Sequence, residues 1–114
     1  MKLKFGVPCS KIKDRIEDVD VHCTNESEAM AIAAGCILAG KKPMVYMQNS
    51  GLCNCVDIIT SLYRPYEIPL PSLLLSIRRS PHHHVYIGGI TYDLLELLDY
   101  TDVEIIEQEE VESE

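Results

Sequence analysis

The chain has 114 residues, of which 46% are hydrophobic and 25% are charged, and its formal net charge is −8. This length is typical of one domain, and the composition is that of an ordinary globular protein. The acidic balance argues against a nucleic-acid partner. No signal peptide is visible, and the apolar stretches are far shorter than the ~20 residues that cross a bilayer, so we expect no membrane partner.

The five cysteines are odd in number, and their spacing matches no zinc-binding pattern. Cys53 and Cys55 form the closest pair. On a helix their side chains would point about 200° apart, which prevents them from sharing a metal ion. We therefore predict no metal site in this chain, and free thiols in a reducing cytoplasm.

In the first half of the chain, short apolar runs alternate with segments of helical spacing. A strand is predicted over residues 3–7 and a helix over residues 10–17. A second strand follows over residues 19–23, and a second helix runs from Asn25 to about Gly40. Asn25 is a suitable N-cap residue, and the acid three positions later completes a capping box.

The second half continues the alternation, with a proline-rich connector before its second strand and an acidic tail at its end. Residues 1–106 are thus predicted to form one domain, and residues 107–114 a disordered tail. The expected elements are a strand at 44–47, a polar turn at 48–51, a helix at 52–63, a strand at 72–77, a helix at 91–99 and a strand at 103–106.

This order predicts an α/β fold with a doubly wound, mostly parallel sheet. Right-handed crossovers bring the turns that follow the strands to one edge, where such sheets bind ligands. Glu26 stands at one of these turns, directly before a helix of small apolar residues. A carboxylate there could serve a ligand, or it could simply be a first-turn acid that the helix dipole favours.

The other candidate residues also have structural interpretations beside the functional ones. The segment Gln48-Asn49-Ser50-Gly51 could contact a ligand or only form a turn and cap the next helix. His82-His83-His84 is predicted to be a surface loop, in which one histidine could act as an acid or base. Arg78 and Arg79 could bind a phosphate or sulfonate, or could be solvated residues at a strand end.

Three segments together resemble the pyrimidine-binding domain of thiamine-diphosphate enzymes, in particular that of the sulfopyruvate and phosphonopyruvate decarboxylases. Phe5 to Ser10 resembles the first strand and turn of that domain. Asn25 to Gly35 resembles the segment that carries its glutamate. Val45 to Asn54, with Thr60-Ser61-Leu62 after it, resembles its most diagnostic segment. The resemblance covers residues 5–106, with Cys53 where the family usually has glycine.

The resemblance implies a role for each matching position. In this family the glutamate that matches Glu26 hydrogen-bonds the aminopyrimidine ring, and so favours the tautomer that removes a proton from the thiazolium carbon. Gln48, Asn49, Ser50 and Gly51 would lie beside the pyrimidine ring. His84 would reach the substrate or an intermediate. The weaker candidates for substrate contacts are Pro8, Cys9, Ser10 and Arg78, with Arg79 as a further candidate for the anionic group.

The resemblance also implies a partner. The chain lacks the Gly-Asp-Gly pattern of the half that binds the diphosphate, and it shows no acidic constellation for Mg²⁺. We therefore expect a beta subunit to supply that site. The expected enzyme is a hetero-oligomeric carboxy-lyase that is active only when the two subunits combine. The expected reaction converts sulfopyruvate to sulfoacetaldehyde and CO₂, as in coenzyme M biosynthesis.

Two alternatives stay open. The small anionic 2-keto acid could instead be phosphonopyruvate. The chain could also be a truncated, non-catalytic α/β binding or assembly module, because it starts close to the first strand and shows no helix after Ile106. In either case we expect a partner to cover the exposed edges of the domain.

Overall fold

The computed structural model describes residues 3–6 and 21–107. The helix predicted over residues 10–17 lies outside these ranges, as do the candidate residues Pro8, Cys9 and Ser10. The predicted disordered tail, residues 107–114, also lies outside them except for Glu107, which is ordered as the last residue of a strand, so the prediction is wrong at that residue. The structural statements below concern the described residues.

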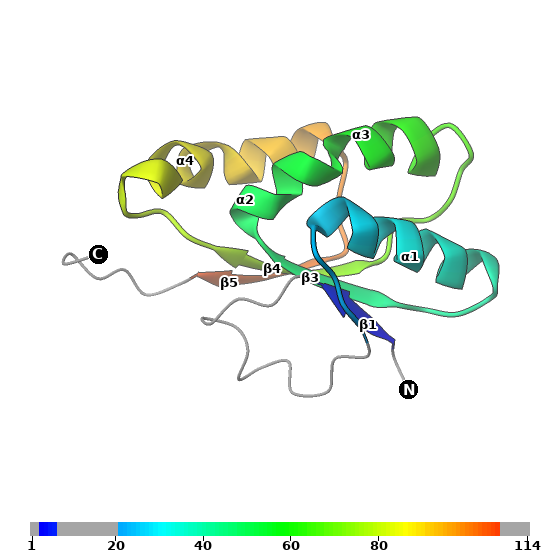
Figure 1. Cartoon of the computed structure of the whole chain (residues 1–114). Helices are drawn as coiled ribbons and strands as arrows, with labels where there is room; N and C mark the ends of the chain where they lie inside the picture. The colour runs from blue at the N-terminus through cyan, green and yellow to red at the C-terminus, as the bar shows by residue number, and fades with distance from the viewer. Residues whose placement is uncertain (1–2, 7–20, 108–114) are drawn as a thin grey trace.

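A five-stranded sheet forms one layer of the described structure (Figure 1), with the strand order β2-β1-β3-β4-β5. Every neighbouring pair of strands is parallel. The prediction of an α/β fold with a parallel sheet is therefore confirmed. The strands are β1 (Lys4–Gly6), β2 (Val21–His22), β3 (Met44–Gln48), β4 (Ser72–Ile77) and β5 (Val103–Glu107).

The helices that the structure describes all cover the same face of the sheet (Figure 1). The connections from β2 to β3, from β3 to β4 and from β4 to β5 advance in one direction across the sheet, so right-handed crossovers place their helices together. The helices are α1 (Glu26–Leu38), α2 (Asn49–Leu52), the 3₁₀ turn η2 (Cys53–Cys55), α3 (Val56–Ile58), the π-helical turn η3 (Ile59–Tyr63) and α4 (His82–Leu97).

Both ends of α1 follow from local sequence. The Asn25 side chain accepts a hydrogen bond from the Glu28 amide at 3.0 Å, and Glu28 Oε1 accepts one from the Thr24 amide at 3.0 Å. At the other end Gly40 adopts φ +85°, and its amide donates to the Ile37 carbonyl. The Lys41 amide reaches the Cys36 carbonyl at 2.9 Å, which completes a Schellman motif. The predicted caps of this helix are confirmed.

Two predicted boundaries are wrong. No polar turn separates β3 from the next helix: Gln48 ends the strand and Asn49 begins α2, so the helical segment starts three residues before the predicted Leu52. Helix α4 begins at His82 instead of Thr91, and the three histidines therefore lie in its first turn rather than in a loop.

The core lies between the sheet and this helical layer. It is built from side chains of β3 and β4, such as Val45 and Leu75, and from the small residues Ala29 and Ala33 of α1. Tyr46 and Leu74 form a separate buried cluster. No helix within the described ranges is long and apolar enough to cross a membrane.

Tyr46 also aligns two strands. It pairs with Gly6 across β1 and β3. A methyl group at Gly6 would lie only 2.7 Å from Cδ1 of the Tyr46 ring and would overlap the Tyr46 carbonyl oxygen. Only glycine therefore leaves room for the tyrosine in this register.

Candidate functional site

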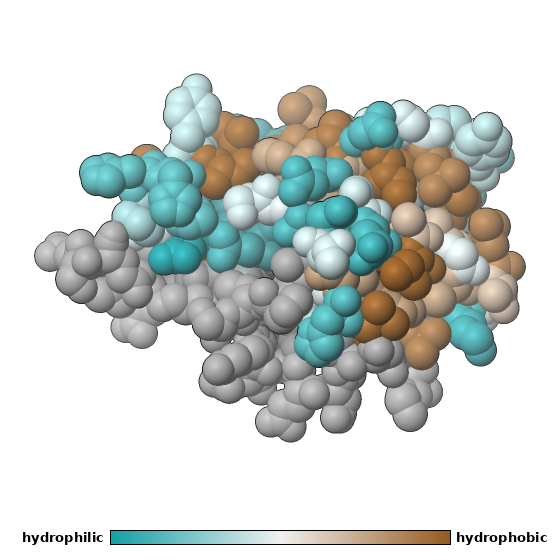
Figure 2. Space-filling model, in the orientation of Figure 1, coloured by the Kyte–Doolittle hydropathy of each residue, from teal (hydrophilic) through white to brown (hydrophobic). Residues whose placement is uncertain are grey.

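The candidate residues within the described ranges lie at the carboxyl edge of the sheet, as predicted. β2 leads into Glu26, β3 leads into α2, and β4 leads into Arg78 and Arg79. The strand order reverses between β1 and β3, which is where ligands bind in sheets of this type. Figure 2 shows hydrophilic residues gathered over α2 and the start of α1.

Glu26 is the first residue of α1, and its side chain is half-buried. The Asn54 side-chain amide donates a hydrogen bond to Glu26 Oε1 at 2.9 Å. Gly51 lies beneath the carboxyl group: a methyl group there would overlap Glu26 Cγ and Cδ, and it would lie 2.5 Å from Oε2. Glycine at position 51 therefore creates the space that the Glu26 side chain occupies.

Cys55 lies in the same region, buried below the surface. Its burial raises the pKa of the thiol to about 12, and the negative charge of Glu26 is the second cause. Cys53, two residues earlier, is exposed. The two thiols therefore lie in different environments.

Asn49 is completely buried, and its side chain binds other parts of the fold. Its amide nitrogen donates to the Arg78 carbonyl at 3.1 Å and to Thr91 Oγ1 at 3.0 Å. Its oxygen accepts from the Arg78 amide at 3.0 Å. Asn49 thus connects the start of α2 to the loop after β4 and to α4.

Gln48 and Ser50 flank Asn49 but are less buried. The Gln48 side-chain amide donates to Ser50 Oγ at 3.1 Å. Gln48 is half-buried at the end of β3, and Ser50 is exposed in α2. Both residues lie near the carboxyl edge, where a ligand could reach them.

His84 is buried within the first turn of α4, with 6% of its surface exposed. Its backbone amide donates to the Pro81 carbonyl at 2.7 Å, and its ring centroid lies 4.0 Å from that of His83. The acid–base role of His84 remains a prediction. The prediction of an exposed loop here is wrong, because the segment is helical and packs this histidine inward.

Arg79 belongs to a polar cluster at the end of β5. Its guanidinium binds both carboxylate oxygens of Glu107, at 3.0 and 3.1 Å, and donates to the Gly88 carbonyl at 2.7 Å. The Tyr92 hydroxyl donates to the same carboxylate at 3.1 Å, and these bonds to Glu107 raise the pKa of Arg79. Arg78 Nε donates to the Ser80 carbonyl at 3.0 Å.

The structure therefore brings Glu26 and Gly51 into contact and pairs Arg79 with Glu107 of the same chain. Asn54 is the contact that sequence reasoning missed. It lies in a segment that resembles the family, but its role depends on a contact 28 residues away in the chain, which local spacing does not predict.

The residues present fit one end of thiamine diphosphate. Glu26 Oε1 already accepts one hydrogen bond, and a carboxyl group has further capacity toward a ring nitrogen. Within residues 3–6 and 21–107, no three histidine, cysteine, aspartate or glutamate side chains are grouped so that they could hold a metal ion. The carboxyl group of Glu26 thus suits a contact with the pyrimidine ring.

No protein-family model matches the chain. Among individual proteins, it is 36% identical over 105 residues to the sulfopyruvate decarboxylase subunit alpha of Methanothermobacter thermautotrophicus, covering 82% of this chain and 63% of that protein. It is 43% identical over 71 residues to the subunit of the same name from Methanocaldococcus jannaschii, covering 56% of this chain and 42% of the relative.

A phosphonopyruvate decarboxylase of Streptomyces viridochromogenes is 38% identical over 108 residues, covering 82% of this chain and 26% of that protein. The chain thus spans less than two thirds of the length of each of these relatives. Its similarity to both kinds of decarboxylase agrees with the resemblance that its sequence motifs indicated.

Proposed function

We propose that this chain, a homologue of sulfopyruvate decarboxylase alpha subunits and of phosphonopyruvate decarboxylases, is one subunit of a thiamine-diphosphate-dependent 2-keto acid decarboxylase. It would bind the pyrimidine end of the cofactor at the carboxyl edge of its sheet. A beta subunit would supply the site for the diphosphate and Mg²⁺. The word "alpha" in the names of the relatives supports such a partner.

The observation that carries this proposal is the setting of Glu26. Its carboxyl group is at the start of a helix, half-buried, with Gly51 beneath it and the Asn54 amide 2.9 Å from Oε1. These contacts fix the direction of the carboxyl group without using all of its lone pairs. A preoriented carboxyl group is what proton exchange with a ring nitrogen requires.

When bound, thiamine diphosphate supplies the carbon nucleophile and the electron sink for loss of CO₂. Glu26 would hold a proton at the pyrimidine ring, and Asn54 would keep the carboxyl group in that orientation. Gln48 and Ser50 would contact the edge of the ring. Asn49 would hold α2 against β4 and α4 and thereby support these contacts, with His84 as the candidate for proton transfer to the substrate.

We favour sulfopyruvate as the substrate because three sulfopyruvate decarboxylase alpha subunits are among the relatives. Phosphonopyruvate remains the alternative, since two phosphonopyruvate decarboxylases align with 82% of the chain. Both substrates are small anionic 2-keto acids. For the location of the protein we propose the cytoplasm, because the free cysteines of the described residues are consistent with a reducing compartment.

The proposal is tested by calorimetric titration of thiamine diphosphate with Mg²⁺. One sample contains the chain alone, and the other contains the chain purified with the proposed beta subunit. We expect tight binding only in the mixture, because the proposed cofactor site is divided between the subunits. Absence of binding in a verified complex would instead favour a non-catalytic module.

The same complex then tests Glu26. The variant Glu26→Gln keeps the size of the side chain but cannot exchange the proton, so turnover of sulfopyruvate should fall by at least about 100-fold. Glu28→Gln is the matched control, because it removes the same charge from the same helix start. Equal turnover in the wild type and Glu26→Gln would remove Glu26 from the reaction. Turnover of phosphonopyruvate alone would change the substrate assignment.

A further inference from the structure

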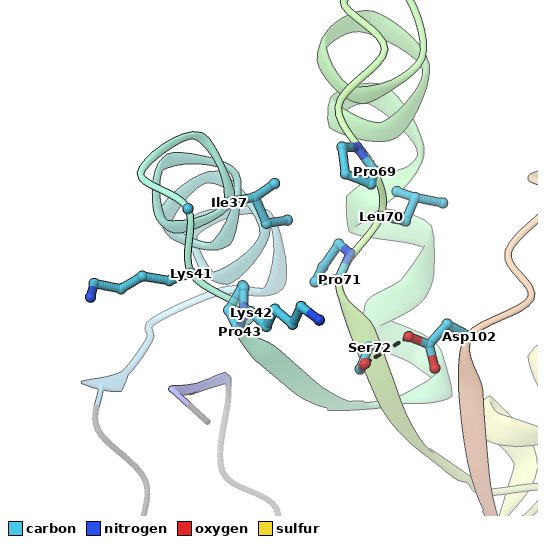
Figure 3. A pocket seen from close by; sticks show the side chains of 10 residues that line it. Ile37, Lys41, Lys42, Pro43, Pro69, Leu70, Pro71, Ser72 and Asp102 are labelled. Atoms are coloured by element: carbon cyan, nitrogen blue, oxygen red, sulfur yellow. Dashed lines mark hydrogen bonds between the residues drawn. The ribbon is translucent and has the colours of Figure 1, made fainter. Parts of the chain in front are cut away.

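A cavity lies at the opposite edge of the sheet, beside the amino ends of β3 and β4 (Figure 3). Its volume is about 480 Å³, within the range of about 300–1,000 Å³ that is typical of small-molecule sites. It opens between the end of α1 and the connector that leads into β4. Neither the proposed reaction nor the candidate residues at the carboxyl edge account for it.

One wall of this amino-edge pocket is apolar and held in place. Ile37 of α1, Pro43 and Leu70 contribute to it, together with Pro69 and Pro71 of the connector. Proline rings fix the φ angle of the backbone, which limits the conformations of the wall.

Hydrogen bonds hold both sides of the pocket. The Tyr100 hydroxyl donates to the Pro71 carbonyl at 2.6 Å and anchors the connector. The Schellman motif at Gly40 fixes the other side. The walls are therefore formed before any ligand arrives, which lowers the entropy cost of binding.

Opposite charges line the remaining surface. The Lys42 side chain extends toward Ser72 and Pro71, whereas the neighbouring Lys41 points away (Figure 3). Asp102 lines the other side, and its Oδ2 accepts a hydrogen bond from the Ser72 hydroxyl at 2.6 Å. The Asp102 carbonyl also accepts from the Leu73 amide at 2.9 Å, so the residue is fixed through both its backbone and its side chain.

Lys42 and Asp102 do not form an ion pair with each other or with another residue of the described ranges. Each charge therefore remains available to a ligand in the space between them. A ligand with only a negative charge would be repelled by the Asp102 carboxylate. A ligand with only a positive charge would be repelled by the Lys42 ammonium group. A ligand that carries both charges would satisfy both residues.

We infer that the amino-edge pocket binds a free amino acid with an apolar side chain. Its carboxylate would contact Lys42, its ammonium group would contact Asp102, and its side chain would lie against Ile37, Leu70 and the prolines. This inference does not depend on the decarboxylase proposal, because the pocket shares no lining residue with the candidate site.

The first test follows amide NMR spectra of the isolated chain during titration with leucine. Two matched probes each lack one charge: 4-methylpentanoate has no ammonium group, and 3-methylbutylamine has no carboxylate. We expect saturable shifts at the pocket with leucine and at least 10-fold weaker binding of both analogues. Absence of saturation with leucine, methionine and phenylalanine overturns the inference, as does equal binding of leucine and either analogue.

The second test uses paired variants. Lys42→Met keeps the length of the side chain but removes its charge, and Lys41→Met is the control because that side chain points away. Asp102→Asn keeps an oxygen that can accept from Ser72. We expect Lys42→Met and Asp102→Asn each to weaken leucine binding by at least 10-fold, with Lys41→Met within 2-fold of the wild type.

The amide spectrum of each variant without ligand verifies its fold. If Asp102→Asn does not fold, the comparison of leucine affinity between Lys42→Met and Lys41→Met is sufficient to test the inference. Equal loss of affinity in the two lysine variants overturns the inference, because it would show a general effect of charge. Unchanged affinity in Lys42→Met overturns it as well.

Discussion

The two halves of the carboxyl edge use their polar side chains differently. In the Glu26 half, defined by Glu26, Gly51 and Asn54, one amide orients a half-buried carboxyl group that keeps further capacity for hydrogen bonds. In the Arg79 half, the guanidinium of Arg79 is directed at Glu107 and at the Gly88 carbonyl. Both halves contain charged residues that the sequence marked as candidates.

The difference shows that charge at the ligand-binding edge of a sheet is not sufficient evidence of a site. Arg79 and Glu107 neutralise each other and join the end of β4 to the end of β5. Glu26 has no cationic partner in the part of the chain that the structure describes. The Glu26 half is therefore the better place for ligand chemistry, and the following variants test this contrast.

The largest effect is expected for Gly51→Ala. The new methyl group would occupy the space of Glu26 Cγ and Cδ, so the carboxyl group must move. Displacement by about 1 Å can reduce a reaction rate by about 100-fold, and we expect at least this loss of turnover in the complex. Stability should change by less than about 1 kcal/mol, because alanine favours the helix and the displaced side chain is flexible.

Turnover assays and urea unfolding of Gly51→Ala measure the two quantities separately. Gly35→Ala is the control, since a methyl group at Gly35 meets no atom within 4 Å. Full turnover in Gly51→Ala would contradict the importance of the position of Glu26.

A large loss of stability is expected for Asn49→Ala. The substitution removes three hydrogen bonds in a fully buried place and leaves the Arg78 amide without its acceptor. The free energy of unfolding should fall by about 3 kcal/mol, as measured by urea denaturation. The exposed neighbour Ser50→Ala should change it by less than about 0.5 kcal/mol. Similar values for the two variants would show that Asn49 does not stabilise the fold.

A smaller effect is expected in the Arg79 half. Arg79 and Glu107 are both substantially exposed, with 41% and 47% of their side chains accessible, and such ion pairs contribute less than about 1 kcal/mol. A double-mutant cycle with Arg79→Gln and Glu107→Gln should give a coupling energy of this size. We also expect the KM for the keto acid to stay within 3-fold in Arg79→Gln. A much larger KM would assign Arg79 to the substrate.

An effect that depends on pH is expected for the Cys55 thiol. Because burial raises its pKa from 9.0 to about 12, the unfolded chain loses this proton at lower pH than the folded chain. The resulting stability is present below pH 9 and is lost as pH rises from about 9 to 12. Cys55→Ala should therefore unfold with a weaker dependence on pH in this window, measured by urea denaturation at a series of pH values.

The same thiol reports on Glu26. Glu26→Gln removes the second cause of the raised pKa and should therefore lower the pKa of Cys55. Carbon NMR of labelled Cys55 measures this value, and Glu28→Gln again serves as the control. An equal change in both variants would mean that Cys55 does not sense Glu26 specifically.

The sequence predicted those parts of the fold that depend on neighbouring residues. The apolar runs of β3 and β4 and the caps of α1 at Asn25 and Gly40 are local signals, and the structure confirms them. The start of α4 was missed because histidine and glycine are weak helix formers. There the fold overrides propensity: Gly88 packs so closely on Arg79 that a methyl group would lie 2.9 Å from its Cα.

The candidate site was predictable in position but not in its contacts. Parallel topology alone brings Glu26 and Gly51 to one edge of the sheet. The hydrogen bonds of Asn49 join residues 29 and 42 positions apart, and that of Asn54 spans 28 positions. Such pairings depend on the packed structure, so spacing along the chain could not separate the connecting role of Asn49 from a ligand contact.

Gly6 affects how precisely Glu26 and Gly51 are placed relative to each other at the carboxyl edge of the sheet. The Gly6 carbonyl accepts the Cys23 amide at 2.8 Å, on the segment that leads to Glu26. On its other side Gly6 holds the Tyr46 ring of β3, the strand that leads to Gly51. Gly6 thus helps to fix the register of the segments on both of its sides. A slip of one residue at β1 would move the carboxyl group of Glu26 by about one strand position, roughly 3.3 Å, away from Gly51.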